Sequence, residues 1–309
     1  MKLPTPQSPT GYLSSLYAES LAELGTPLHL PHSGTWILKR LIPATEYYDA
    51  SGLYPLFCCE DWSKLSTDLG ILLEESPLVS LTVVTDPFGS FTTSQIAECF
   101  PHLVRPFKNH LITRSNCAPD QIASKHHRYY ARRALRRVSV DVCKPDDSFL
   151  EEWWALYQGL IKRHGITGTQ AFSKSAFQQQ MQVPGLVAFK AVAGGQTVSA
   201  HLWYSQDRVA YSHLAASSAS GYKLGASYGL YWSAIEYFRG KVDYMDLGAA
   251  ADRSASDGLS RFKQGWATSS RKTFLCGRIF EGGVYQDLAT REPTNSTYFP
   301  AYRAAGSTA

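Results

Sequence analysis

The chain has 309 residues, a formal net charge of +4, and 44% hydrophobic and 13% aromatic residues. This length predicts two domains of about 150 residues, and the small net charge excludes a protein that binds polyanions over its whole surface. No run approaches the roughly 18 apolar residues of a membrane-spanning helix. Pro4, Pro6 and Pro9 interrupt any signal peptide, so we expect a cytoplasmic protein. The six cysteines lack CxxC spacing, which predicts reduced thiols and neither disulfides nor a metal site.

The first half of the sequence alternates short apolar runs with helical periodicity. It predicts helices at 12–24, 61–73 and 93–100, and strands at 36–41, 79–84 and 108–113. Such alternation favours a layered α/β domain.

Residues 125–137 hold six lysines and arginines, while the remainder of the chain carries about −2. On a helix, the basic side chains form one face and small apolar residues form the other. One interpretation is a solvated amphipathic helix. The other is a binding site for phosphate groups, because guanidinium binds phosphate oxygens in a bidentate way.

The second half predicts two helices followed by an antiparallel meander and then alternating helices and strands. The expected helices are 147–164, 173–181, 224–238 and a short one around 259–263; the expected strands are 186–192, 197–204, 209–215, 242–247 and 273–280. Gly221 and Gly225 precede the third helix, and a helix entered through such a turn offers N–H groups to an anion. The tail from Glu281 is expected to be irregular.

Five stretches together resemble the FemABX-like branch of the GNAT superfamily, which includes the peptidoglycan-bridge aminoacyltransferases. These are HLAASSASGYKLGASYGLYWSAIEYF at 213–238, MDLG at 245–248, GLSRFKQGW at 258–266, and RYYARRALRR at 128–137 with LIKRHG at 160–165. The resemblance implies an α/β fold with mixed α+β sheets. It also implies two tandem GNAT-like domains: a degenerate one at 1–144 on the acceptor side and the acyltransferase domain at 145–285. A tail at 286–309 would return to the first domain.

The resemblance also implies residue roles. The FK pair of the family falls on Phe262 and Lys263, and this lysine would stabilise charge at the transferring carbonyl; a solvated surface lysine is the alternative. His213 and Tyr211 are further candidates for the catalytic site, although both also fit a buried core. The donor would lie on Ser220, Gly221, Tyr222 and Gly225, which approximate the glycine-rich loop of GNAT enzymes. Phosphate groups would bind Arg128, Arg132, Arg133 and Arg136.

The positions of two aspartates in the predicted elements suggest further roles. Asp257 is a candidate base, but it fits a helix cap better. Asp246 lies at a strand end, where ligands collect in open sheets.

The predicted function is transfer of an acyl or aminoacyl group to an amine with formation of an amide, without a metal. Acyl-CoA is the favoured donor because the chain lacks the long heptad-repeat arm that some members use near tRNA, and aminoacyl-tRNA is its rival. Expected acceptors are a cell-envelope precursor, an amino sugar or a small amine. The alternative is a non-catalytic RNA-binding or scaffold protein built on a GNAT fold, with the basic helix as its binding surface.

Overall fold

The computed structural model describes residues 8–75, 77–168, 171–250, 257–290 and 298–304. The chain divides into two compact units. The larger unit comprises Met1–Ser14, Lys108–Thr167 and Ala171–Arg271, and the smaller unit comprises Ser15–Phe107, Gly168–Gln170 and Lys272–Ala309. The division therefore falls within two strands, near residues 107 and 271, rather than at the predicted boundary of residue 144. Residues 108–144 belong with the second half because their strands and helix pack on it.

The larger unit contains a mixed sheet in the strand order β5-β10-β9-β8-β7-β6. Its strands are β5 (Leu103–Arg114), β6 (Ser139–Cys143), β7 (Leu186–Ala193), β8 (Gln196–Gln206), β9 (Val209–Ser217) and β10 (Tyr244–Ala249). Neighbouring strands run antiparallel except for β9 and β10, which are parallel. The meander β7-β8-β9 confirms the prediction from its tight turns.

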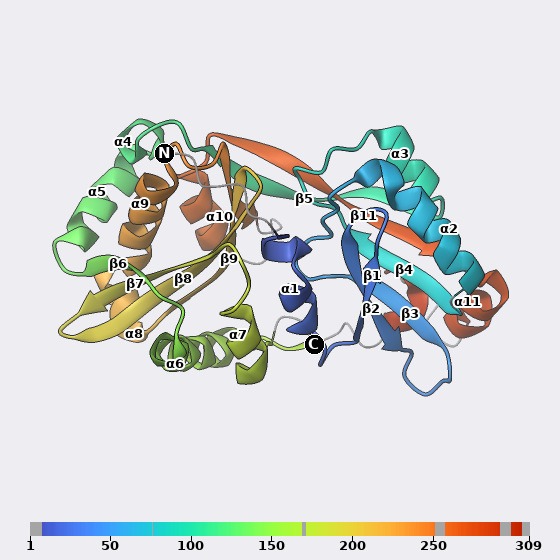
Figure 1. The fold of residues 1–309 in the computed structure, drawn as a ribbon. Helices are drawn as coiled ribbons and strands as arrows, with labels where there is room; N and C mark the ends of the chain where they lie inside the picture. Colours follow the sequence, from blue (N-terminus) through green and yellow to red (C-terminus); the bar gives the residue numbers. More distant parts are fainter. Residues whose placement is uncertain (1–7, 76, 169–170, 251–256, 291–297, 305–309) are drawn as a thin grey trace. The chain divides into compact units, whose positions relative to one another are not determined.

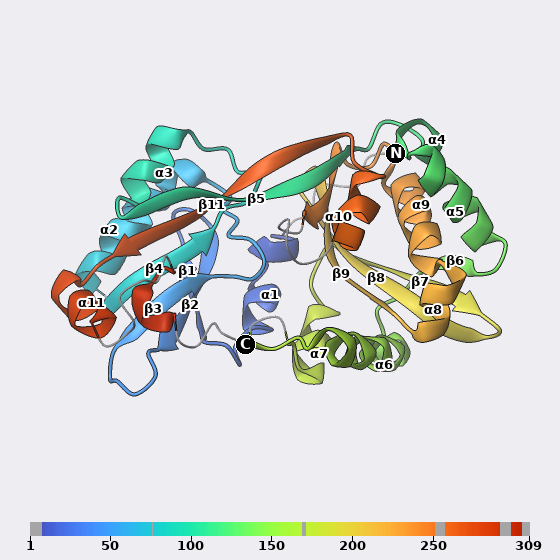
Figure 2. The same cartoon turned by 180° about the vertical axis from the view of Figure 1, so that it is seen from behind.

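Helices cover both faces of this sheet (Figures 1 and 2). The α9 helix packs on β7 and β8 and is itself covered by α5, whereas α6 packs on β8 and β9 from the other face. Because α9 is enclosed in this way, it is apolar on most sides, and Leu230, Ala234 and Phe238 are fully buried. The helices of the unit are η1 (Gly11–Leu13), α4 (Pro119–Ile122), α5 (Lys125–Leu135), α6 (Asp147–His164), α7 (Lys174–Gln180), α8 (Ala219–Leu224), α9 (Ala226–Phe238) and α10 (Asp257–Gln264).

The smaller unit has strands in the order β1-β2-β3-β4-β11, with β3 and β4 parallel. These strands are β1 (Thr26–Leu30), β2 (Thr35–Leu41), β3 (Tyr48–Gly52), β4 (Leu78–Val84) and β11 (Ser269–Ile279). Leu69 of α2 and Ile96 of α3 pack on one side of β4. The helices are α1 (Ser15–Glu19), η2 (Trp62–Lys64), α2 (Leu65–Glu75), α3 (Thr93–Cys99), α11 (Gly282–Ala289) and η4 (Ala301–Arg303).

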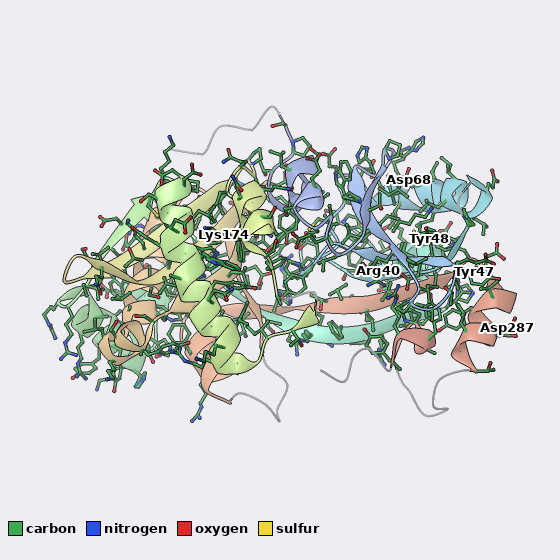
Figure 3. All side chains as sticks on the ribbon, turned by 90° about the horizontal axis from the view of Figure 1, so that it is seen from below. Arg40, Tyr47, Tyr48, Asp68, Lys174 and Asp287 are labelled. Atoms are coloured by element: carbon green, nitrogen blue, oxygen red, sulfur yellow. The ribbon has the colours of Figure 1, made fainter. Side chains whose placement is uncertain are left out.

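The C-terminal segment is held to the smaller unit by a buried carboxylate. Asp49 on β3 accepts hydrogen bonds from the guanidinium groups of Arg40 and Arg303, at 3.1 Å from Arg40 Nε and 2.8 Å from Arg303 Nη2. Tyr302 adds a hydrogen bond of 2.8 Å to Ser80 on β4. Figure 3 labels Arg40 on this unit. A buried carboxylate requires such partners. The bond between Arg303 and Asp49 therefore holds η4 against β3.

Some elements differ from the sequence prediction. Residues 282–289 form α11 rather than irregular tail, because Leu288 and Val284 pack against Ile42 and Val79. The expected helix at 12–24 is reduced to η1 and α1. Strands β1, β3 and β6 were not anticipated because their sequences are polar or only partly buried, and pairing with neighbours defines them.

Candidate functional site

Strands β9 and β10 separate in the larger unit. They pair at Tyr244–Val209, Met245–Ala210 and Asp246–Tyr211. Beyond Asp246, no described residue of β10 pairs with β9, and the register of β10 against β5 shifts as well. Since ligands bind beyond the carboxyl ends of parallel strands, this separation is the first indication of a site.

Asp246 is buried at this point, with 1% of its surface exposed. Its Oδ2 accepts a hydrogen bond of 2.7 Å from Nδ1 of His110 on β5, and its Oδ1 accepts one of 2.8 Å from the N–H of Gly248. Gly248 has a φ of +85°, which a glycine adopts without strain. The carboxylate therefore has a fixed orientation, as a buried charge requires.

Lys263 of α10 reaches the same place. Its Nζ donates a hydrogen bond of 3.2 Å to the carbonyl oxygen of Ala249. A Cβ at Gly248 would lie 2.9 Å from this Nζ, so the glycine leaves room for the ammonium group. Burial lowers the pKa of Lys263 to about 8, against the opposing effect of the Asp246 carboxylate and with a smaller contribution from the positive charge of Lys108. Lys263 is therefore a desolvated cation, not a surface lysine.

Neutral polar groups from three further elements complete the site. His201 of β8 lies with Nε2 at 2.8 Å from Oγ of Ser212 on β9, and its Nδ1 is buried with no hydrogen-bond partner among the described residues. Burial, with smaller contributions from the charge of Lys263 and from His213, lowers the pKa of His201 to about 3, so the ring is uncharged. Burial raises the pKa of Tyr231 on α9 to about 12, although a hydrogen bond with Ser212 opposes this.

Aromatic packing fixes α10. The ring of Phe262 meets those of Tyr228 and Tyr231 edge-on, with centroids 4.9 and 5.0 Å apart. Nε2 of His127 donates a hydrogen bond of 2.8 Å to the carbonyl oxygen of Phe262. Gly265 is required beside it, because a Cβ there would lie 2.0 Å from the His127 ring. Phe262, a predicted catalytic residue, therefore lies in an aromatic cluster, where it positions Lys263.

Tyr211 and His213 face away from Lys263. His213 lies with Nδ1 at 3.2 Å from the hydroxyl of Tyr12 and Nε2 at 3.3 Å from Oε1 of Gln180. The ring of Tyr211 contacts that of Tyr12, with centroids 5.5 Å apart. Because side chains alternate along a strand, Ser212 faces the site and its two neighbours face η1 and α7. Burial lowers the pKa of His213 to about 3, in keeping with a core residue.

The predicted donor-binding loop is a short helix. Within α8, Oγ of Ser218 accepts from the N–H of Gly221 at 3.1 Å, and its carbonyl accepts from Tyr222 at 3.0 Å. The N–H of Gly225 bonds to Tyr222 at 3.1 Å, and Oγ of Ser220 lies 2.8 Å from that of Ser218. Three of the amides expected to hold phosphate are thus engaged within the chain.

The four predicted phosphate-binding arginines lie on α5 and its C-terminal cap. Arg132 and Arg136 are exposed, and Arg128 and Arg133 are half-buried. Asp120 accepts hydrogen bonds from two of them, through its carbonyl to Arg128 at 2.7 Å and through Oδ1 to Arg132 at 2.9 Å. A surface ion pair of this kind is weak and leaves guanidinium donors for an anion.

Other features bear on the class of protein. Within the described ranges, no group of three or more histidine, cysteine, aspartate or glutamate side chains has the geometry of a metal site. Across that same part of the chain, every helix is too short or too polar to cross a bilayer. All six cysteines are free thiols, as expected.

A comparison with protein families finds a match within the larger unit. A model of the acetyltransferase (GNAT) domain matches residues 123–264, which include Asp246 and Lys263, and indicates acyl transfer as the general activity. No curated protein matches the sequence.

Solved structures resemble the chain over most of its length. FemX aligns with a TM-score of 0.67 at 14% identity, over 91% of this chain and 95% of FemX. L-PGS from Bacillus licheniformis aligns with a TM-score of 0.58 at 15% identity, over 93% and 98% of the two chains. The C-terminal domain of a putative lysylphosphatidylglycerol synthetase from Agrobacterium fabrum aligns with a TM-score of 0.57 at 15% identity, over 89% of this chain and 90% of that domain. Residues 123–264 are therefore similar to a GNAT domain, and the chain shares the fold of FemX and L-PGS.

Proposed function

We propose that the protein transfers an acyl or aminoacyl group to an amine, with Lys263 as the group that stabilises the oxyanion of the tetrahedral intermediate. The observation that carries this proposal is the desolvated ammonium group of Lys263 beside the separated ends of β9 and β10. A cation in such an environment acts strongly on a developing negative charge, because little water screens it and it needs no reorganisation.

The surrounding contacts support this role. Phe262 and His127 hold α10 in place, and the Ala249 carbonyl orients the ammonium group. A pKa of about 8 keeps Lys263 protonated near pH 7, which is the state that donates a hydrogen bond to an oxyanion. Removal of one such donor costs about 10²–10³ in rate in other enzymes.

Acyl-CoA is the donor suggested by the GNAT domain match. Aminoacyl-tRNA is the second candidate, and two observations favour it. The amides of Gly221, Tyr222 and Gly225 are engaged within α8, and the exposed guanidinium groups of Arg132 and Arg136 suit a phosphate backbone. The names of the related structures, FemX and lysylphosphatidylglycerol synthetase, are consistent with an acceptor of the cell envelope. An amino sugar or another small amine is the alternative acceptor.

The test is a transfer assay read by mass spectrometry. Purified protein is incubated with acetyl-CoA or with a mixture of aminoacyl-tRNAs, and with amino sugars, simple alkylamines or cell-envelope precursors. We expect a product heavier by one acyl or aminoacyl group from wild type, and its loss from Lys263→Ala. A protein that binds tRNA with steep salt dependence, but forms no product with any donor, would instead be a non-catalytic RNA-binding protein.

A further inference from the structure

We propose that His110, oriented by Asp246, accepts the proton of the attacking amine. This inference rests on the proposed acyl transfer and assigns its proton acceptor. Acyl transfer to an amine has two electrostatic requirements: the carbonyl oxygen gains negative charge, and the attacking nitrogen must lose a proton. Lys263 meets the first requirement, but a cation cannot meet the second.

The hydrogen bonds of Asp246 determine how the His110 ring is protonated. A carboxylate only accepts, so Nδ1 of His110 must carry the proton in the 2.7 Å bond to Oδ2. In the neutral ring, Nε2 then holds the lone pair. No described residue hydrogen-bonds to Nε2, and the His110 side chain retains 9% of its surface exposed. A carboxylate that orients a histidine in this way is the arrangement that makes histidine a general base in other enzymes.

The same residues bring His110 close to Lys263. Ala249, whose carbonyl accepts the bond from Lys263, is the register partner of His110 across the β10–β5 pair. Asp246 also acts electrostatically on Lys263. One carboxylate thus organises a cation for the carbonyl oxygen and a base for the amine.

The proton balance of the step is complete. The neutral amine attacks the donor carbonyl carbon, a C–N bond forms, and the oxygen becomes an anion beside Lys263. The amine nitrogen gives one proton to Nε2 of His110. The intermediate collapses, the bond to the leaving thiolate or ribose oxygen breaks, and the imidazolium returns the proton to that leaving group.

The alternative role for His110 is structural, since its bond to Asp246 ties β5 to β10. The two roles predict different effects of a His110 substitution on the rates with different acceptors. An alkylamine must lose a proton to become acylated and would depend on His110. A weakly basic nucleophile such as hydroxylamine is neutral near pH 7 and loses its proton readily once bonded to carbon, so it would depend on His110 much less. Lys263 would be required by both.

The experiment compares wild type, His110→Gln, Asp246→Asn and Lys263→Ala with an alkylamine and with hydroxylamine. Asparagine retains an acceptor for the Gly248 amide, so Asp246→Asn limits disruption of the fold. His32→Gln is the matched control, because His32 in the smaller unit also bonds an aspartate through Nδ1, at 2.9 Å from Asp68. Circular dichroism and thermal melting confirm that each variant is folded.

We expect His110→Gln to lower the alkylamine rate by about 10²–10⁴, the usual contribution of a general base, and the hydroxylamine rate by less than about tenfold. Lys263→Ala should lower both rates alike, and His32→Gln neither. Equal losses of both rates in His110→Gln, or no loss, would overturn the proton-acceptor role and leave acyl transfer standing. Absence of transfer by wild type with either nucleophile would overturn the proposed function and this role with it.

The protonation form of the His110 ring can also be measured without enzyme turnover. Nitrogen-15 NMR of the histidine rings should show the Nδ1–H form of neutral His110 in wild type and its loss in Asp246→Asn. The Nε2–H form in wild type would contradict the proposal, because Nε2 would then have no lone pair with which to accept the proton of the amine.

Discussion

Replacement of Lys263 by methionine should lower activity by about 10²–10³ and at the same time stabilise the fold. The lysine has a pKa of about 8 in the folded protein because burial disfavours its charge, against an ordinary value of 10.5. Near pH 7, the buried ammonium group of Lys263 is charged and therefore destabilises the folded state relative to the unfolded state. The difference corresponds to about 3 kcal/mol, at roughly 1.4 kcal/mol per pKa unit. Methionine has a similar shape and carries no charge.

The dependence on pH follows from proton linkage. Between a pH of about 8 and 10.5, the unfolded chain binds more protons at this lysine than the folded chain does, so the stability of wild type rises with pH. The advantage of Lys263→Met should therefore fall from about 3 kcal/mol near pH 7 to under about 1 kcal/mol near pH 10.

Urea denaturation of both proteins at the two pH values measures this change. Lys64→Met, at an exposed position on η2, is the control and should shift stability by less than about 0.5 kcal/mol at either pH. A Lys263→Met protein that is no more stable than wild type near pH 7 would refute the reasoning. A gain of equal size at both pH values would refute it as well, because the gain would then come from packing and not from the buried charge.

Three further predictions concern the pH profile, α8 and the tail. With hydroxylamine, which stays neutral above pH 7, the transfer rate should fall as pH rises through about 8, because Lys263 loses the proton that it donates to the oxyanion; a rate–pH profile that stays flat to pH 10 would contradict this. Gly221→Ala should destabilise the fold by about 1–3 kcal/mol, because a Cβ there would lie 2.2 Å from the Val198 carbonyl oxygen; an unchanged denaturation midpoint would argue against that close approach. Arg303→Ala should cost about 3–5 kcal/mol and expose the C-terminal segment to proteolysis, since Asp49 loses one of its two guanidinium partners and keeps Arg40 and the Tyr302 hydroxyl; resistance equal to wild type would show that the pair contributes little.

The sequence was sufficient for most helices and for the meander, because these elements have strong local signals. The predicted helix at 147–164 is followed by Gly165, and it has those bounds in the structure, with Asp146 as its N-cap. Lys263 could be singled out because the GLSRFKQGW stretch is local. Strands such as β3 and β6 depend on partners distant in the sequence, and no local pattern specifies them.

The polar groups around Lys263 show what local patterns miss. Asp246 was noticed for its place at a strand end, but His110, His201, Ser212 and Tyr231 come from four other elements, and only strand register and helix packing bring them together. Alternation along β9 was the one available signal, since it places Ser212 on the face opposite to its neighbours.

The helical structure of the predicted donor-binding stretch has a signal in the sequence. Ser218, three residues before Gly221, is a typical N-cap, and Gly225 is a typical C-terminal glycine, so the stretch between them reads as a short helix. The glycines suggested a phosphate loop because two of them lie four residues apart. In the structure, one packs against a carbonyl and the other adopts a left-handed conformation.

The most direct test of the account is the steady-state rate of amide formation by Lys263→Ala, measured on folded protein with a donor that wild type uses. The account predicts a fall in kcat of about 10²–10³, with donor affinity close to that of wild type, because the ammonium group acts mainly on the oxyanion. A variant that retains kcat within about twofold of wild type would contradict the assignment of Lys263, and with it the site built around this residue.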